Sequence, residues 1–204
     1  MSAAASGALG PIGDPEAFGL LRDKLLAGPW GSAARRALAI VSVHPGDGRS
    51  YVCASLAISL GLLGRRTLLI DADTARPSLH RLFGADNHRG LSDVLAGVER
   101  ASCIQPLSAV PMVSLLPSGP LASMPPQETA LAELVKGATG DFDHVILDTP
   151  PADVRPEALA IAEAAGFALV LACGGSSPLA SVRNLVDALV NAGVQVTGVV
   201  VNDH

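Results

Sequence analysis

Cysteine is scarce in this 204-residue chain, which contains only Cys53, Cys103 and Cys173 and no Cys-x-x-Cys spacing. An odd number of widely separated cysteines argues against a disulfide framework and against a cysteine-based zinc site, and it favours a reducing compartment. The five histidines are scattered along the chain and form no ligand cluster. The composition therefore points away from small secreted scaffolds and from zinc chemistry.

Long apolar runs are also missing. The longest, residues 52–63, contains serines and a glycine, and it falls well short of the roughly 20 residues that a membrane-spanning helix needs. The N-terminus has no charged segment followed by an apolar one, which is the pattern of a secretory signal. We therefore expect a cytoplasmic protein.

Basic and aromatic residues are few. With 14 Lys and Arg against 19 Asp and Glu, the net charge is −5, so the chain has no general attraction for nucleic acid or anionic lipid. We expect no nucleic-acid partner. Because 49% of the residues are hydrophobic but only 3% are aromatic, the core must be aliphatic, which suits helices packed on a buried parallel sheet.

Short apolar segments alternate with helical patterns along most of the chain. The predicted strands are residues 37–41, 67–70, 112–116, 144–147, 167–172 and 196–201, and the predicted helices are residues 14–26, 50–63, 78–83, 91–96, 127–136, 156–164 and 179–191. Parallel strands need crossover helices, which cover the faces of the sheet. We predict an α/β fold with a doubly wound, mainly parallel sheet flanked by helices, and with ligands bound beyond the carboxyl ends of the strands. Residues 1–13 are predicted to be a flexible N-terminal segment, and residues 14–204 a single domain.

A glycine-containing loop follows the first predicted strand. Residues 42–50 read Ser-Val-His-Pro-Gly-Asp-Gly-Arg-Ser, and a strand, a glycine loop and a helix start together form the arrangement that holds nucleotide phosphates. Relative to the pattern G-x-x-x-x-G-K-[ST], Val43 replaces the first glycine and Arg49 replaces the lysine. Ser50 supplies a hydroxyl suited to Mg²⁺. Pro-Gly-Asp-Gly is also an ordinary turn, so the loop taken alone leaves that alternative open.

Carboxylates close two later strands. Asp71 ends the second predicted strand and Asp73 follows it; this pair could hold a hydrated Mg²⁺ or accept a proton from an attacking hydroxyl. Asp148 ends a buried aliphatic strand, the usual second metal-holding position of P-loop proteins. Taken alone, each carboxylate could instead cap a turn or a helix. Because the carboxyl ends of parallel strands meet at one edge, we predict one nucleotide–Mg²⁺ site in which Ser50, Asp71 and Asp148 hold the metal.

With these motifs in hand, the chain resembles the bacterial tyrosine kinases of exopolysaccharide systems, a P-loop NTPase class similar to the partitioning and septum-placement ATPases. The resemblance runs from about Pro15 to Asp203. Its matching stretches are an N-terminal helix motif at residues 15–22, a Walker A loop at 45–50, a Walker A′ stretch at 68–73 with 76–77 and 80–83, and the segments 90–97, 145–151 and 198–202. The Arg-Ser-Tyr sequence of the loop is similar to that of the exosortase-associated branch.

The resemblance implies ATP and Mg²⁺ as cofactors. It implies that the nucleotide is bound by the loop and by the end of the last strand, through Pro45, Gly46, Asp47, Gly48, Arg49, Ser50, Tyr51 and Asn202. It also implies catalytic roles for Asp71, Asp73 and Arg49, with Asp71 assisting metal binding or activating the tyrosine hydroxyl. The implied partner is the cytoplasmic segment of an inner-membrane chain-length-determinant protein, which would place the chain at the inner membrane. A homo-oligomer is a further possible assembly that the resemblance implies.

The chain departs from the family pattern at three points. Ala75 stands where the arginine of D-x-D-x-R belongs, Gly19 replaces the first arginine of the E-x-x-R-x-x-R motif linked to ring assembly, and the printed chain carries Tyr51 but no tyrosine-rich tail. Without such a tail, the alternatives are phosphoryl transfer to a partner protein and plain ATP hydrolysis. Arginine keeps the charge of lysine but is planar and bulkier, so we expect nucleotide binding to survive better than rate.

Two main functions follow. The first is an ATP- and Mg²⁺-dependent protein-tyrosine kinase of a polysaccharide co-polymerase system, which regulates exopolysaccharide chain length and export. The alternative is a non-kinase ATP-binding switch or weak ATPase that acts by nucleotide-dependent assembly with a membrane partner. Against a direct partitioning role, His44 stands where those ATPases carry a signature lysine; we expect it to face solvent. A remote third hypothesis is an anion-binding structural remnant. For Glu157, a salt bridge near the site and a solvated face remain equal alternatives.

Overall fold

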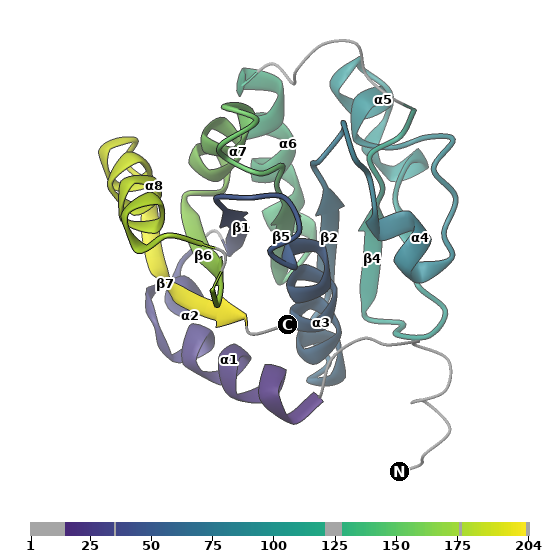
Figure 1. The fold of residues 1–204 in the computed structure, drawn as a ribbon. Helices are drawn as coiled ribbons and strands as arrows, with labels where there is room; N and C mark the ends of the chain where they lie inside the picture. Colours follow the sequence, from purple (N-terminus) through teal and green to yellow (C-terminus); the bar gives the residue numbers. More distant parts are fainter. Residues whose placement is uncertain (1–14, 35, 121–127, 176, 203–204) are drawn as a thin grey trace.

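A computed structural model of the chain describes residues 15–34, 36–120, 128–175 and 177–202. A seven-stranded sheet lies between two layers of helices (Figure 1). The sheet order is β3-β4-β2-β5-β1-β6-β7, and every pairing is parallel except that of β3 with β4. The strands are β1 (Ala37–Ser42), β2 (Thr67–Asp71), β3 (Gln105–Pro106), β4 (Val113–Leu116), β5 (His144–Asp148), β6 (Phe167–Cys173) and β7 (Gln195–Asn202). The predicted doubly wound α/β fold is confirmed.

Alternation along each strand divides the core into two halves. In β1, Ala37, Ala39 and Val41 face one cluster, whereas Leu38 and Ile40 face the other. Successive side chains of a strand point to opposite faces, and both faces are covered, so the central strands are apolar throughout. The core is built almost entirely from aliphatic side chains, as the low aromatic content predicts.

Each face of the sheet has its own set of helices. The first face is covered by α5 (Leu91–Leu95), α6 (Glu128–Asp141), α7 (Glu157–Ala165) and α8 (Leu179–Asn191), and the second by α1 (Pro15–Ala27), α2 (Pro29–Ser32), α3 (Arg49–Leu62) and α4 (Leu79–Phe83). A short 3₁₀ turn spans Arg100–Ser102. None of the helices in the described part of the chain has both the length and the hydrophobicity to cross a bilayer.

The main differences from the sequence-based expectations are short elements. Helix α2 was not expected, because Gly28 and Pro29 indicate the end of a helix; its four residues bury Trp30 completely. Strand β3 was also missed, and its two residues pair antiparallel with β4. Helix α6 continues to Asp141, beyond the predicted end at residue 136. The predicted flexible segment, residues 1–13, lies outside the described residues.

Candidate functional site

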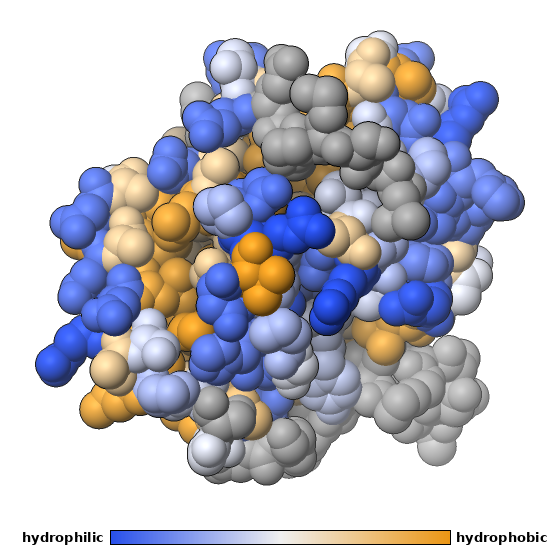
Figure 2. Space-filling model, turned by 45° about the horizontal axis from the view of Figure 1, so that its top comes forward, coloured by the Kyte–Doolittle hydropathy of each residue, from blue (hydrophilic) through white to orange (hydrophobic). Residues whose placement is uncertain are grey.

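Two aspartates end neighbouring strands at the carboxyl edge of the sheet. Strands β2 and β5 pair in register, with Asp71 opposite Asp148, and the amide of Ala72 donates to the Asp148 carbonyl at 2.9 Å. Strand β1 lies on the other side of β5 and leads into the glycine loop. Hydrophilic side chains predominate around the centre of the face in Figure 2, which brings this edge forward. The topology thus assembles the predicted strand-end residues at one place.

The loop needs its two glycines for backbone conformation. Gly46 and Gly48 have φ values of 87° and 92°, which favour glycine because other residues carry a Cβ that clashes there. Gly48 is the N-cap of α3, and a Cβ at this position would lie 2.5 Å from Asn202 Nδ2. The loop therefore reaches the N-terminus of α3 in a conformation that leaves its amides available to an anion.

Ser78 connects the loop to the acidic residues. Its hydroxyl donates to Ser50 Oγ at 2.7 Å, while the amides of Ser78 and Leu79 donate to Asp71 Oδ2 at 2.9 and 3.0 Å. Ser50 and Asp71 are thus linked through one residue at the start of α4. Sequence reasoning gave Ser78 no role in the site; it placed this residue at the start of the predicted helix 78–83, whereas in the structure Ser78 is the N-cap of α4.

Asp71 and Asp148 are buried carboxylates with unpartnered oxygens. Among the described residues, Asp71 Oδ1 and both Asp148 carboxylate oxygens accept no hydrogen bond. Burial, with the nearby charge of Asp71, raises the pKa of Asp148 to about 8. Burial also raises the pKa of Asp71 to about 6, opposed by the amides of Leu79 and Ser78. The nearby Ser50 hydroxyl opposes the rise at Asp148, although it bonds to Ser78.

These unpartnered oxygens fit a divalent cation. A buried carboxylate without partners is costly, and Mg²⁺ prefers carboxylate, hydroxyl and phosphate oxygens together with water. The described residues contain no group of three or more His, Cys, Asp or Glu that could hold a metal ion. A magnesium ion here would therefore need phosphate and water to complete its coordination, which is how Mg²⁺ is usually bound at nucleotide sites.

The Arg49 side chain is turned toward the strand ends. Its Nε donates to the Thr149 carbonyl at 2.8 Å, and Nη1 donates to the His44 carbonyl at 3.0 Å and to Ser42 Oγ. Nη2 lies 4.0 Å from Asp73 Oδ2. Arg49 therefore joins β1, the loop and the end of β5, and most of its donors are committed to protein oxygens.

The other residues predicted to bind the nucleotide differ in their contacts and exposure. The buried Asp47 carboxylate accepts from the His44 amide at 3.0 Å, and Asn202 Nδ2 donates to the Asp47 carbonyl at 3.2 Å. Both residues therefore shape the loop, with Asn202 at its rim. Pro45 and Gly46 are exposed. The Tyr51 ring packs edge-on against Phe18, with ring centroids 5.9 Å apart, so its side chain faces α1.

Two residues without an assigned role in the sequence have partners in the structure. His44 Nδ1 lies 2.8 Å from Asp153 Oδ2 in the loop after β5, and the His44 side chain is 33% exposed, so His44 faces solvent in part and also has a carboxylate partner. Sequence gives no signal for this contact, because the two residues are 109 positions apart. Glu157 Oε1 lies 3.7 Å from Arg155 Nη1. Of the two alternatives for Glu157, a salt bridge or a solvated face, the structure has the salt bridge.

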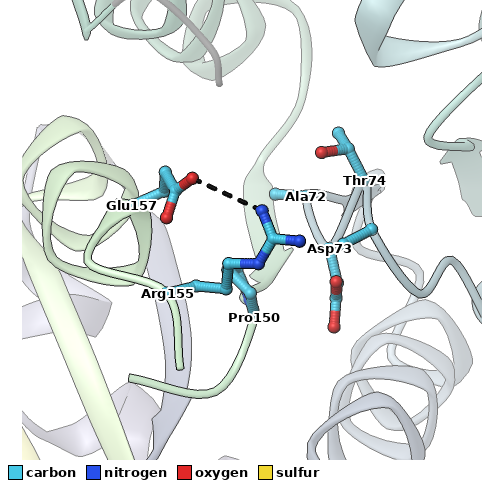
Figure 3. Close-up of a pocket in the computed structure, with 7 residues that line it drawn as sticks. Ala72, Asp73, Thr74, Pro150, Arg155 and Glu157 are labelled. Carbon is cyan, nitrogen blue, oxygen red and sulfur yellow. Dashed lines mark ion pairs between the residues drawn. The ribbon is translucent and has the colours of Figure 1, made fainter. Parts of the chain in front are cut away.

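The Arg155–Glu157 pair lies in a hollow between the loops that follow β2 and β5 (Figure 3). Its lining residues are Ala72, Asp73, Thr74, Ala75, Pro150, Arg155 and Glu157. Asp73 belongs both to this hollow and to the surroundings of Arg49. Through Asp73, the hollow therefore lies next to the strand-end aspartates Asp71 and Asp148.

Comparison with known sequences places this geometry in a family. The sequence pattern of ParA, described as the NUBPL iron-transfer P-loop NTPase, matches residues 33–204. The chain belongs to the ParA family of P-loop NTPases. Its glycine loop, Arg49, Ser50 and Asp148 all lie within the matched residues.

Relatives of this P-loop NTPase are named as tyrosine kinases. The tyrosine-protein kinase wzc of Salmonella typhimurium is 34% identical over 177 residues, which are 83% of this chain and 24% of the relative. The kinase domain of Escherichia coli tyrosine kinase ETK superposes with a TM-score of 0.86 and 28% identity, covering 92% of this chain and 74% of that domain. The chain thus spans about a quarter of the length of the wzc protein.

A second structural relative has a ligand. The septum site-determining protein MinD of Pyrococcus horikoshii, complexed with Mg-ADP, superposes with a TM-score of 0.72 and 27% identity. The match covers 81% of this P-loop NTPase and 69% of that chain. The shared fold with both proteins confirms the P-loop class predicted from the glycine loop.

Arg22, the last residue of the helix motif at residues 16–22, makes contacts within this P-loop NTPase. Arg22 Nη1 donates to the carbonyl and to the hydroxyl of Ser59 in α3, both at 3.1 Å, and Nε donates to Asp23 at 2.8 Å. With a side chain that is 15% exposed, Arg22 fastens α1 to α3. The structure therefore assigns this arginine a role within the chain.

Proposed function

We propose that this chain is the ATP- and Mg²⁺-dependent catalytic domain of a protein-tyrosine kinase that acts in exopolysaccharide chain-length control. The observation that carries the proposal is the group of three unpartnered carboxylate oxygens, on Asp71 and Asp148, beside Ser50 at the start of α3. The names of the relatives, tyrosine-protein kinase wzc and tyrosine kinase ETK, support the kinase over other nucleotide enzymes.

Each residue of the site has a proposed role. The backbone amides of residues 45–51 and the N-terminus of α3 bind the phosphates, and Asn202 borders the base. Ser50, Asp71 and Asp148 would hold Mg²⁺, and the ion would supply neutralisation of the phosphate charge. The tyrosine oxygen attacks the γ-phosphorus, ADP leaves, and the hydroxyl proton passes to the Asp71–Asp73 pair. Asp71 Oδ1, which accepts no hydrogen bond, is available either to bind Mg²⁺ or to take this proton, whereas Oδ2 is held by two amides.

Arg49 has a different proposed role from the lysine it replaces. Its guanidinium already binds the Thr149 and His44 carbonyls and Ser42 Oγ, so its first effect is to hold the strand ends in place. We propose that its remaining Nη2 donors reach toward the phosphate that is transferred. This arrangement favours binding over rate, since a small displacement of a catalytic group can slow transfer about a hundredfold.

The proposed partner is the cytoplasmic segment of an inner-membrane chain-length-determinant protein, which would hold the domain against the membrane. The tyrosine kinases among its relatives support this assignment. A homo-oligomer is a further proposal; in the single chain, Arg22 of the α1 motif is bonded to Ser59.

The alternative function is an ATP-dependent switch or weak ATPase. Two observations favour it: Arg49 donates hydrogen bonds to protein oxygens such as the Thr149 carbonyl, and the fold is similar to that of MinD. Under this alternative, nucleotide binding and slow hydrolysis change the affinity for a membrane partner, and no phosphoryl group reaches a tyrosine.

Labelled ATP separates the two functions. The purified protein is incubated with γ-labelled ATP, Mg²⁺ and a random Glu–Tyr copolymer, and label on tyrosine and ADP release are both measured. A kinase labels the copolymer, and Asp71→Asn abolishes the label while Asp187→Asn, on the exposed face of α8, leaves it intact. Release of ADP without label on tyrosine would refute the kinase and support the switch.

A further inference from the structure

Helix α3 ends in two exposed leucines. Leu62 and Leu63 are 64% and 50% exposed, although most of α3 is buried against the sheet. The helix runs from the glycine loop toward the amino-end edge of the sheet (Figure 1), so this pair lies away from the nucleotide site. A third apolar side chain, Met112, is 43% exposed, and its Cβ is 3.7 Å from the position that a Cβ on Gly61 would occupy. The three side chains therefore belong to one end of the molecule.

The turn after the leucines is held by its backbone. The Arg65 amide donates to the Leu60 carbonyl at 3.2 Å, and the Gly64 amide donates to the Gly61 carbonyl at 2.9 Å. This pair of bonds is the Schellman pattern of a helix end, in which glycine takes the left-handed conformation, and Gly64 has a φ of 76°. The leucines and the arginine that follows are therefore presented to solvent on a fixed turn.

Arginines gather at the same edge of the sheet. Arg65 and Arg66 follow the leucine turn, and both are exposed. Strands β2, β5 and β1 are neighbours in the sheet, so Arg66, Asp143 and Arg36, which directly precede them, lie side by side. Burial first, and then the charges of Arg36 and Arg65, lower the pKa of His144, so both guanidiniums lie near this residue. His144 itself is buried behind them.

The acidic side chains at this edge do not balance the arginines. Asp143 lies 3.6 Å from Arg66 Nη2, and Asp141, two residues earlier, is paired with Arg100. Within the described ranges, neither Arg36 nor Arg65 has an ion pair with a carboxylate. The net charge of −5 therefore conceals a locally basic edge beside the exposed apolar side chains.

An anionic lipid surface fits this combination. Apolar side chains enter the boundary between headgroups and acyl chains, while arginines bind the lipid phosphates. An acidic protein would match the arginines but would need a pocket for the leucines, whereas a bilayer accepts them without one. We propose that this Leu–Arg patch binds the surface of an anionic membrane. The patch consists of Leu62, Leu63, Met112, Arg36, Arg65 and Arg66.

The position of the patch sets the orientation of the bound protein. The patch lies at the amino-end edge of the sheet and the glycine loop at the carboxyl edge, so the nucleotide site would face away from the bilayer. A single patch of this kind binds reversibly and needs a second attachment for stable anchoring. It would therefore orient a domain that a membrane partner already holds. The binding itself does not depend on the proposed kinase function.

Vesicle sedimentation tests this assignment. The 204-residue protein is mixed with vesicles of phosphatidylcholine, either alone or with phosphatidylglycerol as roughly one-third of the lipid. We expect binding to the anionic vesicles, weaker binding at about 0.5 M NaCl, and little binding to the neutral vesicles. Absence of any preference for the anionic vesicles would overturn the assignment.

Two double variants test the two parts of the patch. Arg65→Gln with Arg66→Gln should raise the lipid concentration for half-binding about thirtyfold, because each surface arginine contributes about fivefold. Leu62→Ser with Leu63→Ser should raise it at least about tenfold. Leu179→Ser with Arg183→Gln, on the exposed face of α8, is the matched control and should bind like the unaltered protein. All these variants should keep the thermal shift with Mg-ADP, which shows that they fold.

Other results would contradict the proposed lipid contact. Unchanged vesicle binding in both patch variants would mean that another surface binds the lipid. Binding to poly-glutamate that the arginine variant abolishes, without binding to either kind of vesicle, would make the patch a site for an acidic protein instead. Because the vesicle assay contains no nucleotide, either result leaves the kinase function standing.

Discussion

The two ends of β5 both carry a buried titratable residue, but only one end has the features of a functional site. Asp148 at the carboxyl end and His144 at the amino end are 1% and 2% exposed, and no side-chain nitrogen or carboxylate oxygen of either has a hydrogen-bond partner among the described residues. At the carboxyl end, Asp71 and Ser50 converge on the same point. At the amino end, His144 packs against Trp30, with ring centroids 4.9 Å apart and ring planes tilted by 52°.

The difference lies in how each buried group avoids an unpaired charge. His144 does so by staying neutral, since burial, with the nearby Arg36 and Arg65, lowers its pKa to about 4. Asp148 can avoid an unpaired charge only by holding a proton, with its pKa raised to about 8, or by binding a cation, because Asp71 adds a second negative charge. Several buried carboxylates without hydrogen-bond partners at one point therefore indicate a cation-binding site. A single buried imidazole without a partner, such as that of His144, indicates only that the residue is buried.

The largest expected effect is that of Asp148→Asn. It removes a charge that is unfavourable in the folded protein without metal, so the melting temperature without Mg²⁺ should rise. At a ligand concentration of a hundred dissociation constants, bound Mg-ADP should stabilise the unaltered protein by about 2.7 kcal/mol, and this stabilisation should be lost in the variant. Thermal melts with and without Mg-ADP measure both effects, with Asp187→Asn as the control. An unchanged Mg-ADP shift would refute the role of the carboxyl end.

Arg49→Lys tests how firmly the carboxyl end depends on its guanidinium. Lysine is the usual residue of the loop, but a single ammonium cannot reach the Thr149 carbonyl, the His44 carbonyl and Ser42 Oγ together. We expect the free energy of unfolding to fall by about 1–3 kcal/mol, the range for hydrogen bonds to a charged group, as measured by urea denaturation. A variant that is as stable as the unaltered protein and faster in ATP turnover would contradict this role.

The titratable residues at the two ends of β5 should change the free energy of unfolding in opposite directions as the pH falls. The folded pKa of His144, about 4, lies below the ordinary value of about 6.5, so as pH falls from 6.5 to 4 the unfolded chain binds the proton first and the free energy of unfolding falls. The folded pKa values of Asp71 and Asp148, about 6 and 8, lie above the ordinary carboxylate value, so between pH 8 and 4 these residues add stability as pH falls.

Single variants separate the two contributions. Together the three groups should make stability rise as pH falls from 6.5 to 4; His144→Gln should make that rise steeper, whereas Asp148→Asn should make it shallower. Urea denaturation without Mg²⁺ at pH 7, 6 and 5 measures the slopes. Parallel slopes for the unaltered protein and both variants would show that these groups do not titrate as the structure implies.

The smallest effect is expected for Trp30→Phe. The substitution removes a buried indole N–H that has no hydrogen-bond partner among the described residues, and this gain offsets part of the packing that is lost. We expect a change of stability below about 2 kcal/mol and an unchanged affinity for Mg-ADP, measured by calorimetry. A large change in nucleotide affinity would mean that the amino end of β5 communicates with the site.

Most of the carboxyl end could be predicted from the sequence, because alternating strands and helices indicate a mainly parallel sheet. Asp71 and Asp148 each follow an aliphatic run, and parallel topology then brings them to one edge. The ParA family match confirms the P-loop class. The metal-binding and catalytic roles of these residues stay predictions.

Contacts between distant loops could not be predicted. Ser78, the His44–Asp153 contact and the position of Arg155 depend on how the loops after β2 and β5 fold against the glycine loop. Local sequence carries no signal for such contacts. Helix α2 was missed for another reason: its Gly-Pro start suggests a chain turn, and only the burial of Trp30 stabilises the helical turn that follows.

Calorimetric titration of ADP, with and without Mg²⁺, tests most directly whether Ser50, Asp71 and Asp148 share one divalent cation beneath the nucleotide phosphates. The account predicts that Mg²⁺ tightens ADP binding at least tenfold in the unaltered protein and has no effect in Asp148→Asn. Equal ADP affinity with and without Mg²⁺ in the unaltered protein would contradict it.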